Sequence, residues 1–229
     1  NAVKIQTYTP NTMTINHSSD DFIFKDGTWK GRTLYDLYTE ASTPFEWHKE
    51  LFDYAESLGI TIFSSPFDES AVDLLKNLNS PAYKIASFEI VDLPLISYIA
   101  KTKKPILMST GMASLKEIQN TYDAAIYYGA KKLTLLYCVS NYPSKISDFN
   151  MNNIKIMKKK LATNRRKTLC QSFETSSGTI TRITCSKIGE IIWRFSVHFW
   201  TFRNFLKIKG KFLSPRTPIF GTFSTSSFI

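Results

Sequence analysis

Residues 82–109 read AYKIASFEIVDLPLISYIAKTKKPILMS and contain two short apolar runs with a helical pattern between them. The runs at 82–87 and 105–109 have the length and composition of buried strands. Asp92 can cap the intervening helix, and Pro94 suits its first turn. Two strands joined by a helix pair in parallel, because the crossover returns the chain to the same end of the sheet. The stretch therefore predicts one βαβ unit.

The same unit recurs on both sides of this stretch. Strand-like runs occupy residues 3–8, 60–65 and 133–138, and from residue 60 onward strand starts recur every 22 to 28 residues. Helix signals fill the gaps: a Thr43-Pro-Phe-Glu46 capping box with a stop at Gly59, a cap at Asp68, and a Ser114-x-x-Glu117 capping box with a stop at Gly129. The repetition predicts an α/β fold with a parallel sheet.

Composition limits the protein class. The chain has 229 residues, a net charge of +10, 43% hydrophobic and 21% charged residues, which excludes collagen-like and mostly disordered proteins. Three cysteines, Cys138, Cys170 and Cys185, form no CxxC pair and indicate a reducing, cytoplasmic location. The most apolar stretch, 188–206, is interrupted by two arginines and a histidine, so no membrane span is predicted.

The positive charge is concentrated at one end of the chain. Residues 1–160 contain 18 Lys/Arg and 17 Asp/Glu, whereas residues 161–229 contain 11 Lys/Arg and only Glu174 and Glu190. Helical and strand periodicity also stop near residue 160, where the sequence becomes rich in Ser and Thr. We therefore predict two parts: an α/β part at 1–160, and a basic tail of unassigned fold at 161–229.

Polar residues gather where the predicted strands end, which is where (β/α) barrels place their active sites. Lys4 and Lys84 lie within strands without an acidic neighbour, and a buried charge there requires an anion or a carboxylate. Hydroxyls and one carboxylate accompany them, so we predict a site for a small anion. Its candidate residues are Lys4, Gln6, Ser65, Lys84, Ser87, Glu89, Ser109, Ser140 and Tyr142.

Several alternatives remain open from the residues alone. The lysines can instead extend to solvent or pair with a distant carboxylate, and Lys84 can be a Schiff-base nucleophile of an aldolase. Glu89 can be a solvated loop residue, and Tyr142-Pro143 a substrate lid or a plain turn. His17, His48 and His198 lack metal-ligand spacing, so no metal site is predicted from them, and we interpret His48 as structural.

Seven motifs together resemble the sialic acid synthase family (N-acetylneuraminate synthases), and Phe88 indicates its pseudaminic acid branch. They cover residues 1 to about 160 in the family's order: AVKIQTYTP at 2–10, TLYDLY at 33–38, TPFEWH at 43–48, FSSPF at 63–67, YKIASFE at 83–89, MSTGM at 108–112, and Cys138-x-x-x-Tyr-Pro143. The resemblance implies a TIM (β/α)8 barrel, here incomplete, with strands two to six recognisable and no C-terminal antifreeze-like domain.

The resemblance also implies a reaction: condensation of phosphoenolpyruvate with an N-acetylated amino sugar, giving a nine-carbon keto acid and phosphate. Lys4, Ser65, Lys84, Ser87 and Ser140 would hold phosphoenolpyruvate. Glu89 and Tyr142 would contact the sugar, with Gln6 and Ser109 nearby. The family implies a divalent metal, Mn²⁺ or Mg²⁺, and a homodimer. Two lysines facing an anionic substrate favour anion binding over a Schiff base.

The chain departs from the family pattern at both ends. The strand-one motif with its catalytic Glu, and the later motifs that supply two metal-binding histidines, are not recognisable. We expect this chain to be a fragment with little or no activity alone, read out of frame after about residue 160. A rival hypothesis is that the basic tail binds nucleic acid or anionic lipid, but its aromatic residues form no RNA-binding pattern, and nucleic acid is the weaker candidate.

Overall fold

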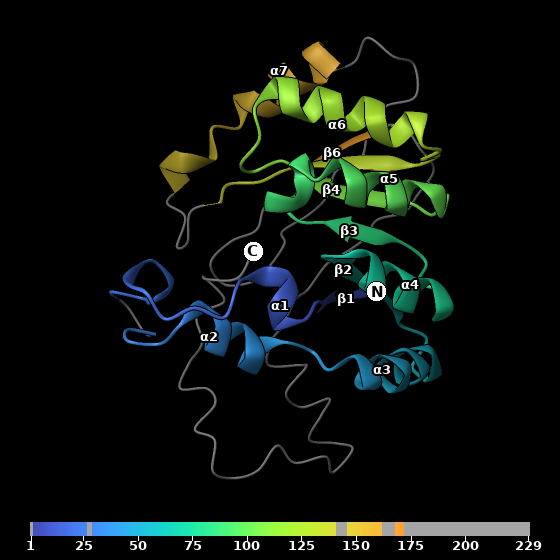
Figure 1. Cartoon of the computed structure of the whole chain (residues 1–229). Helices are drawn as coiled ribbons and strands as arrows, with labels where there is room; N and C mark the ends of the chain where they lie inside the picture. The colour runs from blue at the N-terminus through green and yellow to red at the C-terminus, as the bar shows by residue number, and fades with distance from the viewer. Residues whose placement is uncertain (1, 27–28, 141–145, 162–167, 172–229) are drawn as a thin grey trace.

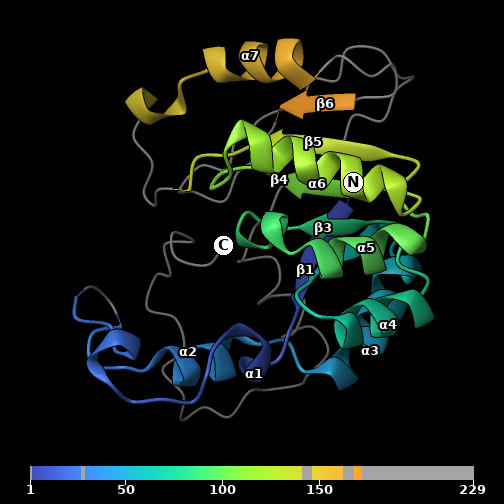
Figure 2. The ribbon, with the colours of Figure 1, turned by 45° about the horizontal axis from the view of Figure 1, so that its top comes forward.

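The computed structural model describes residues 2–26, 29–140, 146–161 and 168–171, and within them one parallel sheet follows the order of the chain (Figure 1). Each strand pairs in parallel with the next, and Figure 2 shows β3, β4, β5 and β6 succeeding one another through the sheet. The strands are β1 (Ala2–Thr7), β2 (Thr61–Pro66), β3 (Tyr83–Ile85), β4 (Ile106–Ser109), β5 (Leu133–Tyr137) and β6 (Thr168–Gln171).

Helices connect the strands as the repeated units predict. The α-helices are α1 (Pro10–Met13), α2 (Leu34–Ala41), α3 (Phe45–Ser57), α4 (Glu69–Asn77), α5 (Leu93–Lys101), α6 (Leu115–Tyr127) and α7 (Asn152–Leu161). Three short 3₁₀ helices are η1 (Asp20–Phe22), η2 (Phe88–Val91) and η3 (Ile146–Phe149). Five strands and four helices, α3 to α6, thus lie where the sequence predicts them, within a few residues.

Three of the predicted helix caps are confirmed. The side chains of Asp68 and Asp92 accept hydrogen bonds from the amides of Ala71 and Leu95, at 2.7 and 3.0 Å. Ser114 and Glu117 form the complete reciprocal capping box. Each cap satisfies an amide that has no partner within its helix, so these residues fix where α4, α5 and α6 begin.

The predicted cap at Thr43 is wrong. Helix α3 begins at Phe45, and its N-cap is Pro44, whose backbone is extended at ψ 137°. The carbonyl of Pro44 accepts the amide of Trp47 at 3.1 Å and a ring nitrogen of His48 at 3.0 Å. The backbone carbonyl of Pro44 therefore accepts a first-turn amide in place of the side-chain cap that the TPFE pattern suggests.

The strand that lies beyond the predicted α/β part is a second difference. The sequence indicates no strand after Lys160, whereas Thr168–Gln171 forms β6 and pairs with β5 from Thr134 to Tyr137. Four residues with mixed polarity are too short to show a period, and pairing with a neighbouring strand supplies the hydrogen bonds that define this one. The described sheet is thus an open six-stranded arc, with β1 and β6 at its two ends.

The sheet has two different faces. Its outer face packs against the helices in one large apolar core, where strand residues such as Ile5, Ile85 and Met108 meet Leu75 and Ile99. Side chains alternate along a strand, so the intervening residues point to the opposite, inner face. Smaller apolar clusters occupy that inner face, including Phe63 with Ala2 and Leu136 with Cys138.

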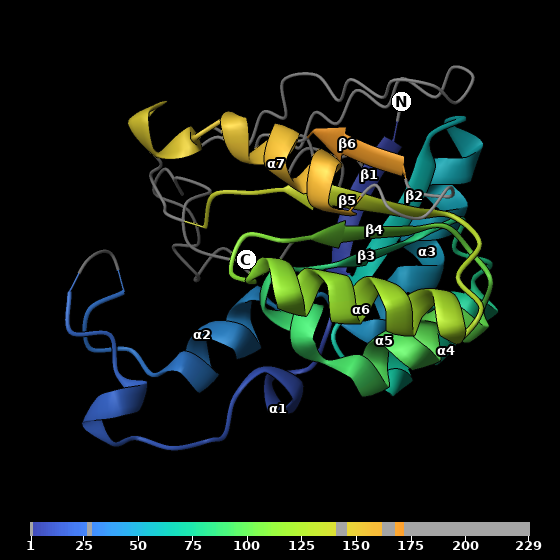
Figure 3. The ribbon, with the colours of Figure 1, turned by 90° about the horizontal axis from the view of Figure 1, so that it is seen from above.

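A long insertion separates β1 from α3 and contains α1 and α2. Figure 3 shows both helices lying on the side toward which the strands point, and therefore at the C-terminal ends of the strands. Thr12 anchors the insertion by donating a hydrogen bond to the carboxylate of Asp68. An edge-on contact between Tyr8 and Tyr38, with ring centroids 5.9 Å apart, attaches α2 to the end of β1.

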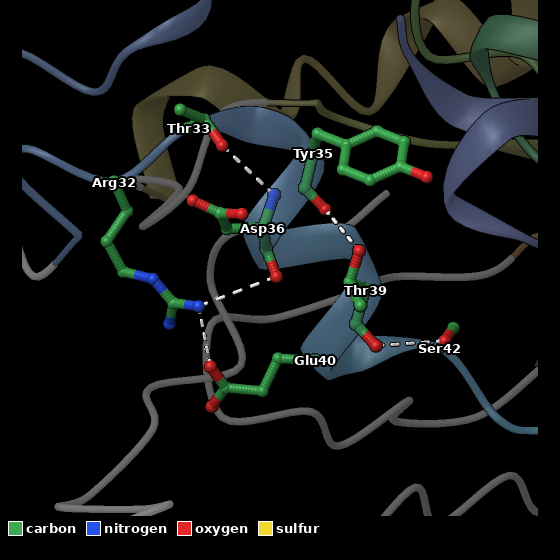
Figure 4. Close-up of polar contacts among 7 residues, drawn as sticks. All are labelled: Arg32, Thr33, Tyr35, Asp36, Thr39, Glu40 and Ser42. Carbon is green, nitrogen blue, oxygen red and sulfur yellow. Dashed lines mark hydrogen bonds and ion pairs between the residues drawn. The ribbon is translucent and has the colours of Figure 1, made fainter. Parts of the chain in front are cut away.

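Local contacts define α2 itself, and Figure 4 shows them. Thr33 caps the helix by accepting the amide of Asp36 at 3.1 Å, and Thr39 donates to the carbonyl of Tyr35 at 2.8 Å. Arg32 forms a salt bridge with Glu40 at 2.6 Å. Because both of its side chains are partly exposed, this ion pair contributes at most about 1 kcal/mol, and the cap is the better-defined boundary.

Within the described residues, no helix combines the length and the apolar composition that crossing a membrane requires.

Candidate functional site

The inner face brings polar residues from four adjacent strands together. Lys4 and Gln6 of β1 alternate with the outward-facing Ile5, and Gln6 pairs in register with Ser65 of β2. Lys84 of β3 and Ser109 of β4 lie on the same face. The structure thus gathers five of the predicted site residues, because parallel strands expose equivalent positions on one face.

Lys84 is at the centre of this polar set and is only 4% exposed. Its ammonium nitrogen donates to the hydroxyl of Ser109 at 2.6 Å and to the carbonyl of Ile85 at 3.3 Å. Among the described residues it forms no salt bridge with a carboxylate. An ammonium has three N–H donors, so one is left for another acceptor, and a buried cation without a counter-ion is suited to an anionic ligand.

Ser109 connects Lys84 to the next strand. Besides the lysine, its hydroxyl oxygen accepts the thiol of Cys138, with 3.3 Å between sulfur and oxygen. Cys138 is 6% exposed and follows β5. The sequence did not single out Cys138 as a site residue, because a lone cysteine at a strand end carries no pattern.

A second polar group forms where β3, β4 and β5 end. The amide of Gly111 donates to the hydroxyl of Ser87 at 3.3 Å. A Cβ atom placed on Gly111 would collide with the hydroxyl of Ser140 and lie 3.0 Å from that of Ser87. Gly111 therefore permits two serine hydroxyls to converge. Its own amide is donated to Ser87, whose hydroxyl proton remains as a donor for a phosphate or carboxylate.

Glu89 lies beside this group on η2. Burial raises the pKa of its carboxyl above the usual range, the charge of Lys84 lowers it, and Asp92 raises it further. Burial and then the charge of Glu89 raise the pKa of Tyr38 on α2. The carboxylate of Glu89 therefore interacts electrostatically with Lys84 on the inner face and with Tyr38 on the insertion helix α2.

Two buried polar atoms at the site have no hydrogen-bond partner among the described residues: Oγ of Ser65 and Oε2 of Glu89. Buried polar atoms are nearly always satisfied in folded proteins, and exceptions mark places where a ligand or water completes the bonding. Both Ser65 and Glu89 are among the site residues predicted from the sequence. Of the other candidates, Tyr142 lies outside the described residues, so its predicted position is untested.

The described residues do not by themselves form a metal site. Residues 2–26, 29–140 and 146–161 contain no group of three or more His, Cys, Asp or Glu side chains that could hold a metal ion. His48 is buried away from the inner face, and His198 lies outside the described residues. The ligands of a resident metal are therefore not found among these described residues, and no chemical step is assigned to a metal.

Comparisons with known proteins identify relatives of this chain. The profile of the NeuB family matches residues 1–165. A pseudaminic acid synthase of Helicobacter pylori is 52% identical over 149 residues, which cover 65% of this chain and 44% of that protein. A pseudaminic acid synthase of Campylobacter jejuni is 45% identical over 159 residues, covering 69% of this chain and 46% of that protein.

Solved structures show the same fold. The crystal structure of an N-acetylneuraminic acid synthetase from Leptospira borgpetersenii superposes with a TM-score of 0.64 at 23% identity, covering 77% of this chain and 55% of that one. The chain spans a little under half the length of the curated relatives it matches. The predicted family resemblance and the incomplete (β/α) barrel are confirmed.

Proposed function

Because this chain belongs to the NeuB family, we propose that its inner face binds phosphoenolpyruvate as part of a synthase that joins this compound to an N-acetylated amino sugar. The reaction forms a nine-carbon keto acid of the pseudaminic or N-acetylneuraminic type and releases phosphate. The names of two similar synthases, at 52% and 45% identity, support the pseudaminic type. The observation that carries the proposal is Lys84, a buried cation that forms no salt bridge within the described residues.

The proposed roles follow from position. Lys84 directs its remaining N–H at the phosphate or carboxylate, with Lys4 on the same face as a second cation. Ser65, Ser87 and Ser140 donate hydroxyls to the same anion, and the Gly111 amide lies among them. Gln6 and Ser109 position the lysines. Glu89, held apart from solvent by burial, contacts a hydroxyl of the sugar, as does Tyr142.

The expected ligands and partners beyond these residues are also proposals. We propose a divalent metal, Mn²⁺ or Mg²⁺, which when bound polarises the sugar aldehyde, and a homodimeric assembly, both from family membership. The described residues do not supply the ligands of that metal. A cytoplasmic location is supported by three cysteines that form no disulfide pattern.

Binding of phosphoenolpyruvate to the full chain tests the proposal directly. Isothermal titration calorimetry is expected to show saturable binding that weakens as salt rises, because screening reduces the attraction between the lysines and the anion. Pyruvate, which lacks the phosphate, is the matched control and should bind more weakly. No heat of binding at millimolar phosphoenolpyruvate would refute the proposed function.

The Schiff-base aldolase is the alternative that the same lysine permits. Its N–H bonds to Ser109 and Ile85 already orient the ammonium, which favours ion binding over nucleophilic attack. Incubation with pyruvate and borohydride, followed by mass spectrometry, is therefore expected to leave Lys84 unmodified. A reduced pyruvyl adduct on Lys84 would instead establish aldolase chemistry.

We also propose that residues 161–229 differ in origin from the synthase part at 1–160. Their net charge of +9 and the end of the family match at residue 165 support this. Translation of the coding DNA in the other two frames downstream of codon 160 is expected to show further NeuB-family sequence. Absence of family sequence from both frames contradicts the frameshift.

A further inference from the structure

A buried chain of hydrogen bonds lies directly behind the candidate site, on the outer face of the sheet. It joins three side chains that are completely shielded from solvent, Thr7, His48 and Ser64. The hydroxyl of Thr7 lies 2.8 Å from Nε2 of His48 and 2.6 Å from the hydroxyl of Ser64. Ser64 donates to the carbonyl of Ile5 at 3.0 Å, and Nδ1 of His48 lies 3.0 Å from the carbonyl of Pro44.

The carbonyls of Pro44 and Ile5 accept the two terminal hydrogen bonds, and they determine which group donates in each bond. A carbonyl only accepts, so Nδ1 of His48 carries a proton and donates to Pro44. Burial lowers the pKa of His48, which favours the neutral ring, and Nε2 of a neutral ring then accepts from Thr7. The single proton of Ser64 remains for the Ile5 carbonyl and the Thr7 oxygen. The His48 ring and the Thr7 hydroxyl therefore have one defined orientation each, whereas the Ser64 proton is shared between two acceptors.

Two of the three hydrogen-bonded side chains belong to residues that directly adjoin a residue of the proposed site. Thr7 follows Gln6, and Ser64 precedes Ser65, and these two neighbours pair in register on the inner face. His48 joins both strands to the first turn of α3. Since successive side chains alternate between faces, an outer-face bond that fixes Thr7 and Ser64 also fixes the direction of Gln6 and Ser65.

Packing alone would not provide this restraint. Apolar side chains at these three positions could fill the same space but would have no directional preference, whereas a buried polar chain is stable only when its bonds are made. The insertion that follows β1 leaves and returns at this strand end, because Thr7 and His48 are 41 positions apart in the chain and in contact. A directional anchor at this point keeps the strand end in register.

We propose that His48, acting through Thr7 and Ser64, is a positioning residue that orients Gln6 and Ser65 for binding of phosphoenolpyruvate. The inference rests on the proposed function, since that function assigns Ser65 to the ligand and Gln6 to positioning the lysines that bind it. His48 does not touch the ligand, because it lies on the opposite face of the sheet. Its effect is transmitted by two hydroxyls and the strand backbone.

The test compares Thr7→Val with Thr7→Ser in the full chain. Valine keeps the shape of threonine and removes the hydroxyl, whereas serine keeps the hydroxyl and removes the methyl group. We expect Thr7→Val to raise the Kd for phosphoenolpyruvate by about tenfold and Thr7→Ser to stay near the unchanged protein. Thr102→Val is the matched control. It also removes a hydroxyl that donates to a backbone carbonyl, that of Ile99, but this bond lies at the end of α5 and outside the Thr7–His48–Ser64 network.

A second measurement does not depend on the ligand. Amide hydrogen exchange of Gln6 and Ser65 is expected to quicken in Thr7→Val but not in Thr7→Ser, and ¹⁵N NMR should show the neutral His48 ring protonated at Nδ1. Binding of phosphoenolpyruvate that is equal in the valine and serine variants overturns the positioning role while leaving the proposed function intact. If the protein without substitutions binds no phosphoenolpyruvate, the proposed function fails. In that case the exchange measurement still tests the positioning role, which is overturned if the amides of Gln6 and Ser65 exchange no faster in Thr7→Val.

Discussion

Replacement of Lys84 by methionine is expected to weaken phosphoenolpyruvate binding by about 100-fold or more, while the free energy of unfolding stays the same or rises. Methionine fills nearly the same volume and carries no charge. It removes the ammonium that supplies a charge-assisted bond to the anion, and it also removes the cost of burying a cation that has no salt bridge in the described residues. Affinity and stability should therefore change in opposite directions.

Calorimetric titration gives the affinity of Lys84→Met, and urea unfolding gives its stability. Lys76→Met is the control, because Lys76 is exposed in the last turn of α4 and changes the net charge by the same amount. An equal loss of affinity in both variants would show that net charge rather than position governs binding. An unchanged affinity in Lys84→Met would remove this lysine from the site.

The second large effect is expected for Gly111→Ala. The added methyl group collides with the Ser140 hydroxyl and crowds Ser87 and the carbonyl of Cys138, at 3.0 and 3.2 Å. Overpacking of this kind costs about 1–3 kcal/mol of unfolding free energy. Ser140 is the neighbour that can rotate away, and this rotation takes one hydroxyl out of the proposed anion site. Binding of phosphoenolpyruvate should therefore fall together with stability.

A double variant separates the two consequences. Gly111→Ala combined with Ser140→Gly removes the colliding hydroxyl, so urea unfolding should recover most of the lost free energy. Binding should not recover, because the hydroxyl proposed to hold the anion is gone, and Ser140→Gly alone should bind as weakly as the double variant. Full recovery of binding in the double variant would exclude Ser140 from the site.

Short-range signals in the sequence predicted much of the fold. Asp68, Asp92 and Ser114 cap helices through amides three residues away, so their patterns are visible in a few letters. The TPFE pattern at Thr43 has the spacing of a capping box but fails, because α3 begins at Phe45 and its N-cap is Pro44, whose side chain cannot accept a hydrogen bond. Strand β6 was missed because pairing with β5 defines it.

The same distinction holds for the candidate site: residues marked by local signals were predicted, whereas contacts between distant segments were not. Lys84 stood out because a lysine interrupts an apolar strand, and Ser65 stood out because it lies where a predicted strand ends. The convergence of Gly111 with Ser87 and Ser140 depends on three separate loops, and the Thr7–His48 contact joins residues 41 positions apart. Contacts of that range require the register of the sheet, which only the folded chain reveals.

The strand order makes the two lysines of the inner face unequal in the assembly of the protein. Lys84 meets its partner Ser109 across 25 residues, whereas Ile5, beside Lys4, meets Ser64 across 59. Closing the longer loop costs about 0.8 kcal/mol more chain entropy, so β1 is the later strand to join and, among the described strands, it is paired only with β2. The half of the anion site on β3 and β4 therefore forms through the shorter loop, and the half on β1 and β2 forms through the longer one.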